Sequence, residues 1–199
     1  MMDDLMMHVL DLAMNSVAAG ARTVWIRVAE DPAEDRLVLR VVDNGCGMSP
    51  GLLAAARDRF ATTKGGRSRP IGLGLALLRQ TAEMCNGALT VLSRPREGTL
   101  VEAWMQRSHI DRPPVGDCAA TLFDLVVGNP AVGFRFTRCV GGEGYTFDSR
   151  AVRRMLGGAE GLQRPEGMRR VRDELERGER GLTTQRERVQ GEKVQGSRV

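Results

Sequence analysis

The segment from Asp43 to Met48 (DNGCGM) closes a run of apolar residues and holds two glycines within three positions. The apolar run, Leu37 to Val42, is typical of a strand, so the Asp43 carboxylate is expected at the rim of a sheet. Glycines in this place allow a tight turn or a close approach of backbone to a ligand. A plain Asp-Asn-Gly turn before a helix explains the same residues equally well. The segment alone therefore leaves a structural turn and a binding loop as alternatives.

The remaining pattern predicts an α+β sandwich, in which helices cover one face of a mixed sheet. Helices are expected over residues 3–19, from 49–50 onward and over 72–85, and strands over 23–29, 37–42, 88–93 and 99–105. Together they form a main domain of residues 1–108. A small appended α-β-β-α unit is expected over residues 109–158, with a helix at 117–127, strands at 133–140 and 144–147, and a closing helix at 149–156 capped by Ser149. Residues 159–199 are rich in charge, Gly and Gln, which predicts a disordered tail or a frayed helix.

Charge and composition exclude several classes of protein. The chain carries 16 basic and 17 acidic residues up to Ser149, and 13 basic and 8 acidic after it, so the basic excess belongs to the tail. Because a nucleic-acid footprint needs basic residues clustered on a folded face, this distribution argues against nucleic-acid binding. The four cysteines form no metal or disulfide pattern, and the acidic start does not resemble a secretory signal. With no apolar run of about 20 residues, the chain is expected to be cytoplasmic, without a membrane partner.

The first helix carries a narrow polar stripe on an otherwise apolar surface. At about 100° per residue, four polar side chains fall on one side of the helix wheel: Asp4, His8, Asp11 and Asn15. A stripe of this kind lines a cavity, or it is simply the exposed side of a helix with a narrow solvent face. The wheel favours neither alternative.

Three segments in this order resemble the motifs of the GHKL ATPases, the superfamily of type II topoisomerase, heat-shock chaperone, histidine kinase and mismatch-repair ATP sites. Asp11 to Ser16 is similar to its acidic/Asn helix, the Asp43–Met48 segment to its first glycine box, and Gly72 to Leu75 to its second. The resemblance implies a Bergerat-type sandwich that binds ATP and Mg²⁺.

The resemblance also assigns roles to residues of the first helix and the first glycine box. Asn15 would complete the coordination of Mg²⁺ between the phosphates, since an amide oxygen is a hard ligand. Asp11 would hold the metal or activate water as the catalytic residue; hydrolysing relatives commonly have the longer Glu there. Asp43 would accept the exocyclic amine of adenine, which selects ATP over GTP. The other residues expected around adenine are Gly45, Gly47, Met48 and the supporting Thr99.

The phosphates are expected between the second glycine box and a lid. Free N–H groups of a helix that opens at Gly72, Leu73, Gly74 and Leu75 would face them. The lid would begin at Phe60 and bring Thr62, Thr63 and Lys64 to the phosphates. Many relatives have a glycine where this chain has Pro70, so lid closure is expected to differ. His8 is either a phosphoacceptor or, as we favour, a polar neighbour that orients Asp11 or caps the pocket mouth.

Several short segments resemble a narrower group, the small stand-alone bacterial histidine-kinase-like ATP-binding proteins encoded near iron-only hydrogenase subunits. These segments are residues 15–21, 60–64, 82–87 and 127–130. The resemblance implies a weak ATPase or phosphotransfer switch that acts on a partner protein of unknown identity, and it leaves a homodimer open. The alternative is a regulatory module of the anti-sigma type that sequesters or phosphorylates its partner.

Overall fold

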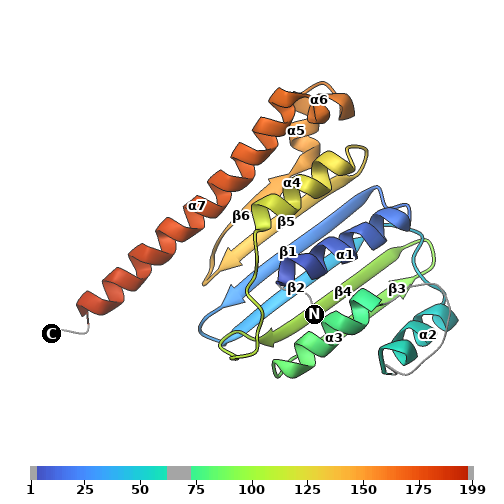
Figure 1. The fold of residues 1–199 in the computed structure, drawn as a ribbon, viewed down its shortest axis with the longest axis horizontal. Helices are drawn as coiled ribbons and strands as arrows, with labels where there is room; N and C mark the ends of the chain where they lie inside the picture. Colours follow the sequence, from blue (N-terminus) through green and yellow to red (C-terminus); the bar gives the residue numbers. More distant parts are fainter. Residues whose placement is uncertain (1–3, 62–72, 197–199) are drawn as a thin grey trace.

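The computed structural model describes the backbone of residues 4–61 and 73–196 and the side chains of residues 4–56 and 74–182 (Figure 1). A six-stranded sheet has the order β3-β4-β2-β1-β5-β6. All neighbours are antiparallel except β1 and β5, which run parallel, so the predicted mixed sheet is confirmed. The strands are β1 (Thr23–Asp31), β2 (Arg36–Asp43), β3 (Ala88–Arg94), β4 (Gly98–Gln106), β5 (Gly133–Val140) and β6 (Glu143–Asp148).

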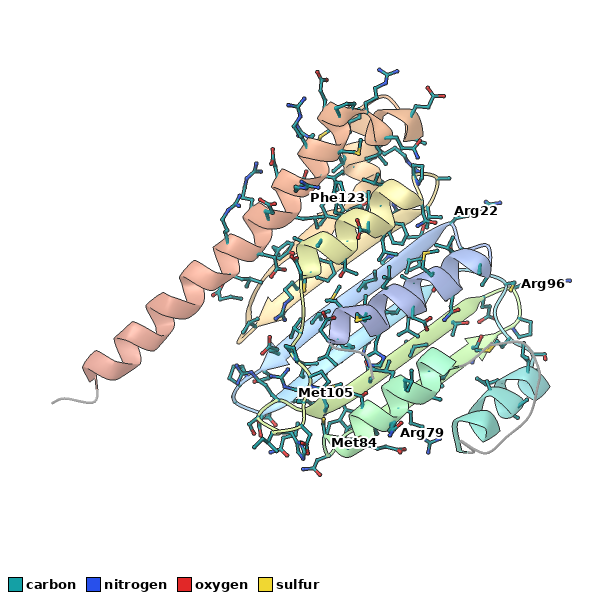
Figure 2. All side chains as sticks on the ribbon, in the orientation of Figure 1. Arg22, Arg79, Met84, Arg96, Met105 and Phe123 are labelled. Atoms are coloured by element: carbon teal, nitrogen blue, oxygen red, sulfur yellow. The ribbon has the colours of Figure 1, made fainter. Side chains whose placement is uncertain are left out.

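Helices α1, α3 and α4 lie side by side on one face of this sheet (Figure 1). The helices are α1 (Leu5–Ala18), α2 (Pro50–Ala61), α3 (Leu73–Met84), α4 (Cys118–Gly128), α5 (Ser149–Met155), α6 (Ala159–Gln163) and α7 (Pro165–Gly196). Alternate strand residues point into the layer between helices and sheet, as Val24, Ile26 and Val28 of β1 do, and all three are buried. Figure 2 shows side chains filling this layer, with the fully buried Met105 of β4 among them. Most of the buried side chains are aliphatic, but the largest fully buried ones are three phenylalanines of β5 and β6, Phe134, Phe136 and Phe147.

Local signals explain where several elements begin and end. Asp4 caps α1, because its side chain accepts a hydrogen bond from the backbone N–H of Met7. Asn86, two residues after the last residue of α3, adopts the left-handed conformation (φ 55°) that ends a helix. The predicted cap of α5 is wrong by one residue. The side chain of Asp148 accepts from Arg150 N–H, and the Ser149 hydroxyl accepts from Phe134 N–H at 2.8 Å instead.

The elements predicted after residue 109 occur in the expected order, and they extend the main sheet. β5 pairs with β1 over eight positions, from Thr23 opposite Gly133 to Glu30 opposite Val140. The linker before α4 also contacts the main domain, since Pro114 and Val115 carbonyls accept the first two N–H groups of α1. The sheet is therefore continuous across the boundary expected at residue 109.

Of the two alternatives predicted for the tail, disorder or a helix, the structure shows a helix over most of residues 159–182. α6 and α7 are helical, and Val171, Leu175 and Leu182 of α7 are buried against the rest of the protein. Their spacing of four and seven residues places them on one side of the helix, where α4 and β6 cover them. The overall composition of the tail does not reveal this apolar stripe, because most of the residues between its members are charged. Within the described residues, no helix combines the length and the apolar character that a membrane span requires.

Candidate functional site

Asp43 ends β2 at the rim of the sheet, as predicted, and its carboxylate is held at both oxygens. Oδ1 accepts from the Gly45 backbone N–H at 2.8 Å, and Oδ2 accepts from the Ser16 hydroxyl of α1 at 2.9 Å. The residue is 8% exposed. A buried carboxylate fixed by one helix and one loop can present a remaining lone pair to a ligand in a single orientation. Ser16 lay within the sequence motif, but its bond to Asp43 was not foreseen.

The loop after Asp43 explains why both glycines are needed there. Gly47 has a φ of +63°, and a Cβ atom on it would lie 1.9 Å from the carbonyl oxygen of Arg94. A Cβ on Gly45 would lie 2.9 Å from the Ala19 carbonyl oxygen. The side-chain oxygen of Asn44 accepts from two backbone N–H groups at the start of β1. The loop is therefore packed tightly between the end of α1 and the β3–β4 turn.

Thr99 and Met48 lie beside this loop, joined by a serine that the sequence did not suggest. Thr99 is the cross-strand partner of Asp43. Its hydroxyl lies 2.9 Å from the Ser93 hydroxyl, and the Ser93 oxygen accepts from the Met48 backbone N–H at 2.8 Å. Met48 is half-buried and packs against the core. Ser93 stands 45 positions from Met48, so the pairings of β3 with β4 and of β4 with β2 bring them together.

Asp11 and Asn15 lie one turn apart on α1, and Asp11 faces the start of α3. The Asn15 amide donates to Asp11 Oδ2 at 3.1 Å. Gly74, in the first turn of α3, leaves room for the Asp11 carboxylate, since a Cβ on Gly74 would lie 1.8 Å from Oδ2. Leu75 follows in the same turn and is half-buried against the core. The Asp11 carboxylate, with the Asn15 amide beside it, therefore lies at the N-terminal end of α3, where backbone N–H groups point outward.

His8 is 2% exposed and lies between α1 and α3. Its Nε2 is 3.4 Å from the Thr81 hydroxyl of α3, and Nδ1 has no partner among the described residues. Burial lowers the pKa of His8 from its ordinary value, against the raising effect of Asp11 and Asp4. A group buried in this way is not presented to a phosphate donor. The geometry favours the alternative in which His8 is a polar neighbour of Asp11.

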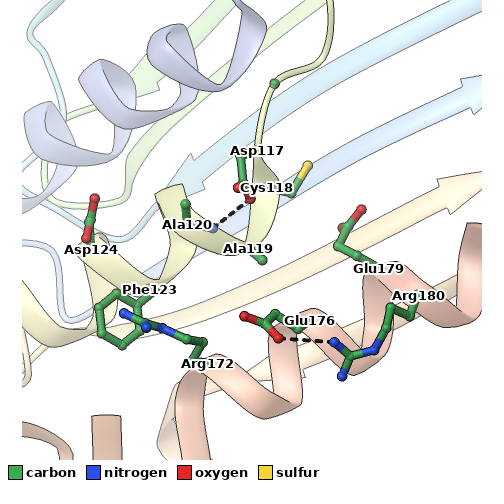
Figure 3. Close-up of a pocket in the computed structure, with 11 residues that line it drawn as sticks. Asp117, Cys118, Ala119, Ala120, Phe123, Asp124, Arg172, Glu176, Glu179 and Arg180 are labelled. Atoms are coloured by element: carbon green, nitrogen blue, oxygen red, sulfur yellow. Dashed lines mark hydrogen bonds and ion pairs between the residues drawn. The ribbon is translucent and has the colours of Figure 1, made fainter. Parts of the chain in front are cut away.

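Four of the expected phosphate-binding residues lie outside the described residues: Thr62, Thr63, Lys64 and Gly72. Among the described residues, a cleft opens beside Asp43. It lies between the end of β2, the β3–β4 turn and the side chain of Leu53 on α2. Asp43, Ser93 and Thr99 line it. A larger hollow lies elsewhere, between α4 and α7 (Figure 3). It contains none of the motif residues.

The contact at Gly74 yields a prediction. If the site turns over Mg²⁺-ATP as the motif resemblance implies, Gly74→Ala is expected to lower that turnover about tenfold, because the new methyl group displaces the Asp11 carboxylate. Thermal unfolding of the variant separates this effect from any loss of stability that the same clash causes. Gly51→Ala in α2 is the matched control, because a Cβ there meets nothing within 4 Å. The rate of phosphate release is measured for both variants. Equal rates would contradict the role given to Asp11.

Comparison with known proteins identifies the fold of this site. The model of the histidine kinase-, DNA gyrase B- and HSP90-like ATPase family matches residues 2–109, which is just over half of the chain. The chain belongs to this ATPase family. The matched range contains α1, the loop after β2, the start of α3 and Thr99, so the family supports ATP as the ligand of the site.

Individual relatives share the same part of the chain. The chain is 33% identical over 104 residues to the sensor histidine kinase ZraS of Salmonella typhimurium, covering 52% of this chain and 22% of ZraS. It is 32% identical over 118 residues to the non-motile and phage-resistance protein of Caulobacter vibrioides, covering 56% and 14%. This ATPase-family chain thus spans no more than about a fifth of the length of these curated relatives.

A solved structure supports the fold alone. The N-terminal domain of a DNA repair protein matches with a TM-score of 0.51 and 16% sequence identity, over 81% of this chain and 59% of that chain. The coverage of 81% of this chain is larger than the share that the family model matches. The shared architecture therefore reaches beyond the family range.

Proposed function

We propose that this chain binds Mg²⁺-ATP at the site described above and acts as a weak ATPase or phosphotransfer switch on a partner protein. The observation that carries the proposal is the position of α1. One side of the helix holds Asp11 against the start of α3, with the Asn15 amide hydrogen-bonded to it, and Ser16, one residue further, holds the carboxylate of Asp43. Residues suited to a metal-bound triphosphate and to a purine are thus coupled through two turns of one helix.

The residues present fit a magnesium ion that is shared with a nucleotide. Asp11 and Asn15 offer a carboxylate and an amide oxygen, the hard ligands that Mg²⁺ prefers. No group of three or more His, Cys, Asp or Glu able to hold a metal occurs among the described residues, so protein atoms there do not form a complete cage. That is the pattern expected when substrate phosphates supply the remaining ligands. Bound there, the ion would neutralise charge on the phosphates during transfer.

Each described side chain then has a defined part in binding. Asp43 accepts the exocyclic amine of adenine, while its bonds to Gly45 and Ser16 keep it from rotating. GTP has a carbonyl at that position, which would face the carboxylate without a proton between them, so ATP is selected. Thr99 contacts the Ser93 hydroxyl, which accepts from the Met48 N–H. These contacts hold Met48 in place beside the base. The first turn of α3 offers N–H groups to the phosphates.

Asp11 limits the rate in this proposal because its side chain is short. Asp11→Glu adds one methylene, about 1.5 Å of reach, and is expected to raise phosphate release several-fold. Asp11→Asn, which has no basic oxygen, is expected to reduce release to about one-hundredth or less. ATP affinity should change little in the Glu variant. A Glu variant slower than the native chain would show that Asp11 mainly holds the metal.

The fate of γ-labelled ATP tests the proposed reaction. The purified chain with Mg²⁺ is expected to release label slowly as phosphate, and to transfer it to a protein when the physiological partner is present. Stable label on the chain itself that is lost in His8→Ala would contradict the structural role given to His8. A partner that binds without label and leaves on addition of ATP would favour the anti-sigma-type module. No label in phosphate, chain or partner would overturn the proposal.

A further inference from the structure

The face of the sheet opposite the helices carries a basic hollow. Among the described residues, the helices that contact the sheet pack on the side that faces the viewer in Figure 1. On the other side, Trp25 of β1 is 37% exposed, and a hollow opens around it. Its floor is apolar, from Trp25 and Val42, and its rim holds three arginines, Arg27, Arg40 and Arg135.

The arrangement of these arginines costs stability in the isolated chain. Arg27 and Arg40 are direct cross-strand partners in the antiparallel β1–β2 pair, and like charges in that position are destabilising. Arg135 lies on the other side, paired with Trp25 in the β1–β5 ladder. Only Arg40 of the three has a carboxylate partner, Glu102 of β4; no hydrogen bond or ion pair joins the side chain of Arg27 or Arg135 to another described residue. A departure of this kind from local stability rules is expected at functional sites.

We propose that this hollow docks an acidic segment of a partner protein, with an apolar side chain of that segment seated on Trp25 and Val42. Carboxylates of the partner would lie against Arg27 and Arg135 and relieve the repulsion between Arg27 and Arg40. Charge complementarity is the reason for this occupant, because the rim holds three arginines and both acidic neighbours already have partners. Glu102 pairs with Arg40, and Asp148, which lies across the strand from Arg135, pairs with Arg150. Tryptophan and arginine are also the residues most enriched at interface hot spots.

Two other occupants fit less well. A second copy of the chain in a symmetric pair would present the same patch, so the arginine rims would face one another. A single strand of nucleic acid requires several open aromatic rings for successive bases. Here Trp104, the other tryptophan of the chain, already has the Arg36 guanidinium over its ring at 4.6 Å. The proposal does not depend on ATP binding, since none of the residues proposed to bind the nucleotide lines the hollow; Val42 is the one residue that lines both the hollow and the cleft beside Asp43.

A labelled peptide tests the surface directly. The probe is a short fluorescein-labelled peptide of alternating Glu and Leu, whose binding to the full chain is followed by fluorescence anisotropy. The double variant Arg27→Glu/Arg135→Glu is expected to bind it at least about tenfold more weakly than the native chain. The control, Arg169→Glu/Arg177→Glu on exposed positions of α7, changes the net charge equally and should alter affinity less than about twofold.

Each other outcome overturns the proposal. These outcomes are no binding by the native chain, equal loss in the control variant, tighter binding of a matched Lys/Leu peptide or of oligothymidylate, and self-association abolished by Arg27→Glu. A second readout is stability. Arg27→Thr is expected to raise the Tm by about 1–2 °C while it weakens the peptide, because it removes the like-charge pair. A lower Tm would show that Arg27 serves the fold alone.

Discussion

Replacing Asp43 by Ala is expected to weaken ATP binding by about 100-fold. The carboxylate is buried, and it is the only group proposed to accept the amine of adenine. A hydrogen bond to a charged acceptor in such a place contributes about 1.5–3 kcal/mol, and the loop loses its anchor at Gly45 as well. Calorimetric titration with Mg²⁺-ATP measures the change, and circular dichroism checks that the variant is folded. An unchanged dissociation constant would remove Asp43 from the site.

Ser16→Ala separates recognition of the base from positioning of the carboxylate. This variant keeps the bond from the Gly45 N–H to Asp43 and removes only the hydroxyl that holds Oδ2. The expected loss of ATP affinity is about tenfold or less, because the carboxylate remains and is less well oriented. If Ser16→Ala were as damaging as Asp43→Ala, the serine would itself contact the nucleotide.

The second large effect concerns stability. Glu30→Ala is expected to lower the free energy of unfolding by about 3–5 kcal/mol and the Tm by about 10 °C. Glu30 of β1 is 6% exposed and forms ion pairs with Arg138 of β5 and Arg107 after β4. Arg138 is itself 4% exposed, and its Nε has no hydrogen-bond partner among the described residues. Removing the carboxylate leaves this charge buried in the seam between β1 and β5.

Two further variants show whether the effect comes from the buried charge. Glu30→Leu together with Arg138→Met should recover most of the lost stability, since apolar residues of similar size often replace buried ion pairs without cost. Glu83→Ala, which breaks the exposed pair with Arg79 on α3, should cost less than about 1 kcal/mol. Thermal unfolding followed by circular dichroism compares all three. A small effect of Glu30→Ala would mean that water reaches Arg138.

The periodicity of apolar residues and the residue types at turns predicted most of the fold. The alternation in 23–29 and 37–42 gave both strands within two residues at each end, and Asn86 ended α3 as its left-handed preference requires. The tail was harder to predict, because the three apolar residues that α7 buries stand among many charged ones. Their stripe is stabilised by α4 and β6, which are distant in sequence. Tertiary packing, rather than propensity, decides such a helix.

The sequence predicted those site residues that share one short motif. It did not predict the residues that come together only through strand pairing or helix packing. Asp11 and Asn15 share one helix, so their spacing already places them together. Ser93 enters only through the register of β3 with β4, which no short motif carries. The same holds for the Ser16–Asp43 bond, which spans 27 positions. Thr62, Thr63, Lys64 and Gly72 remain expectations from resemblance.

The central claim is that Asp43 and Asn15 serve one Mg²⁺-dependent ATP site. Calorimetric titration of the full chain with ATP and with GTP, each with and without Mg²⁺, tests it most directly. The account predicts saturable binding of one ATP per chain, weakened about tenfold or more without Mg²⁺ or in Asn15→Ala, and weaker binding of GTP. The absence of binding heat with Mg²⁺-ATP, or equal affinity for GTP, would contradict it.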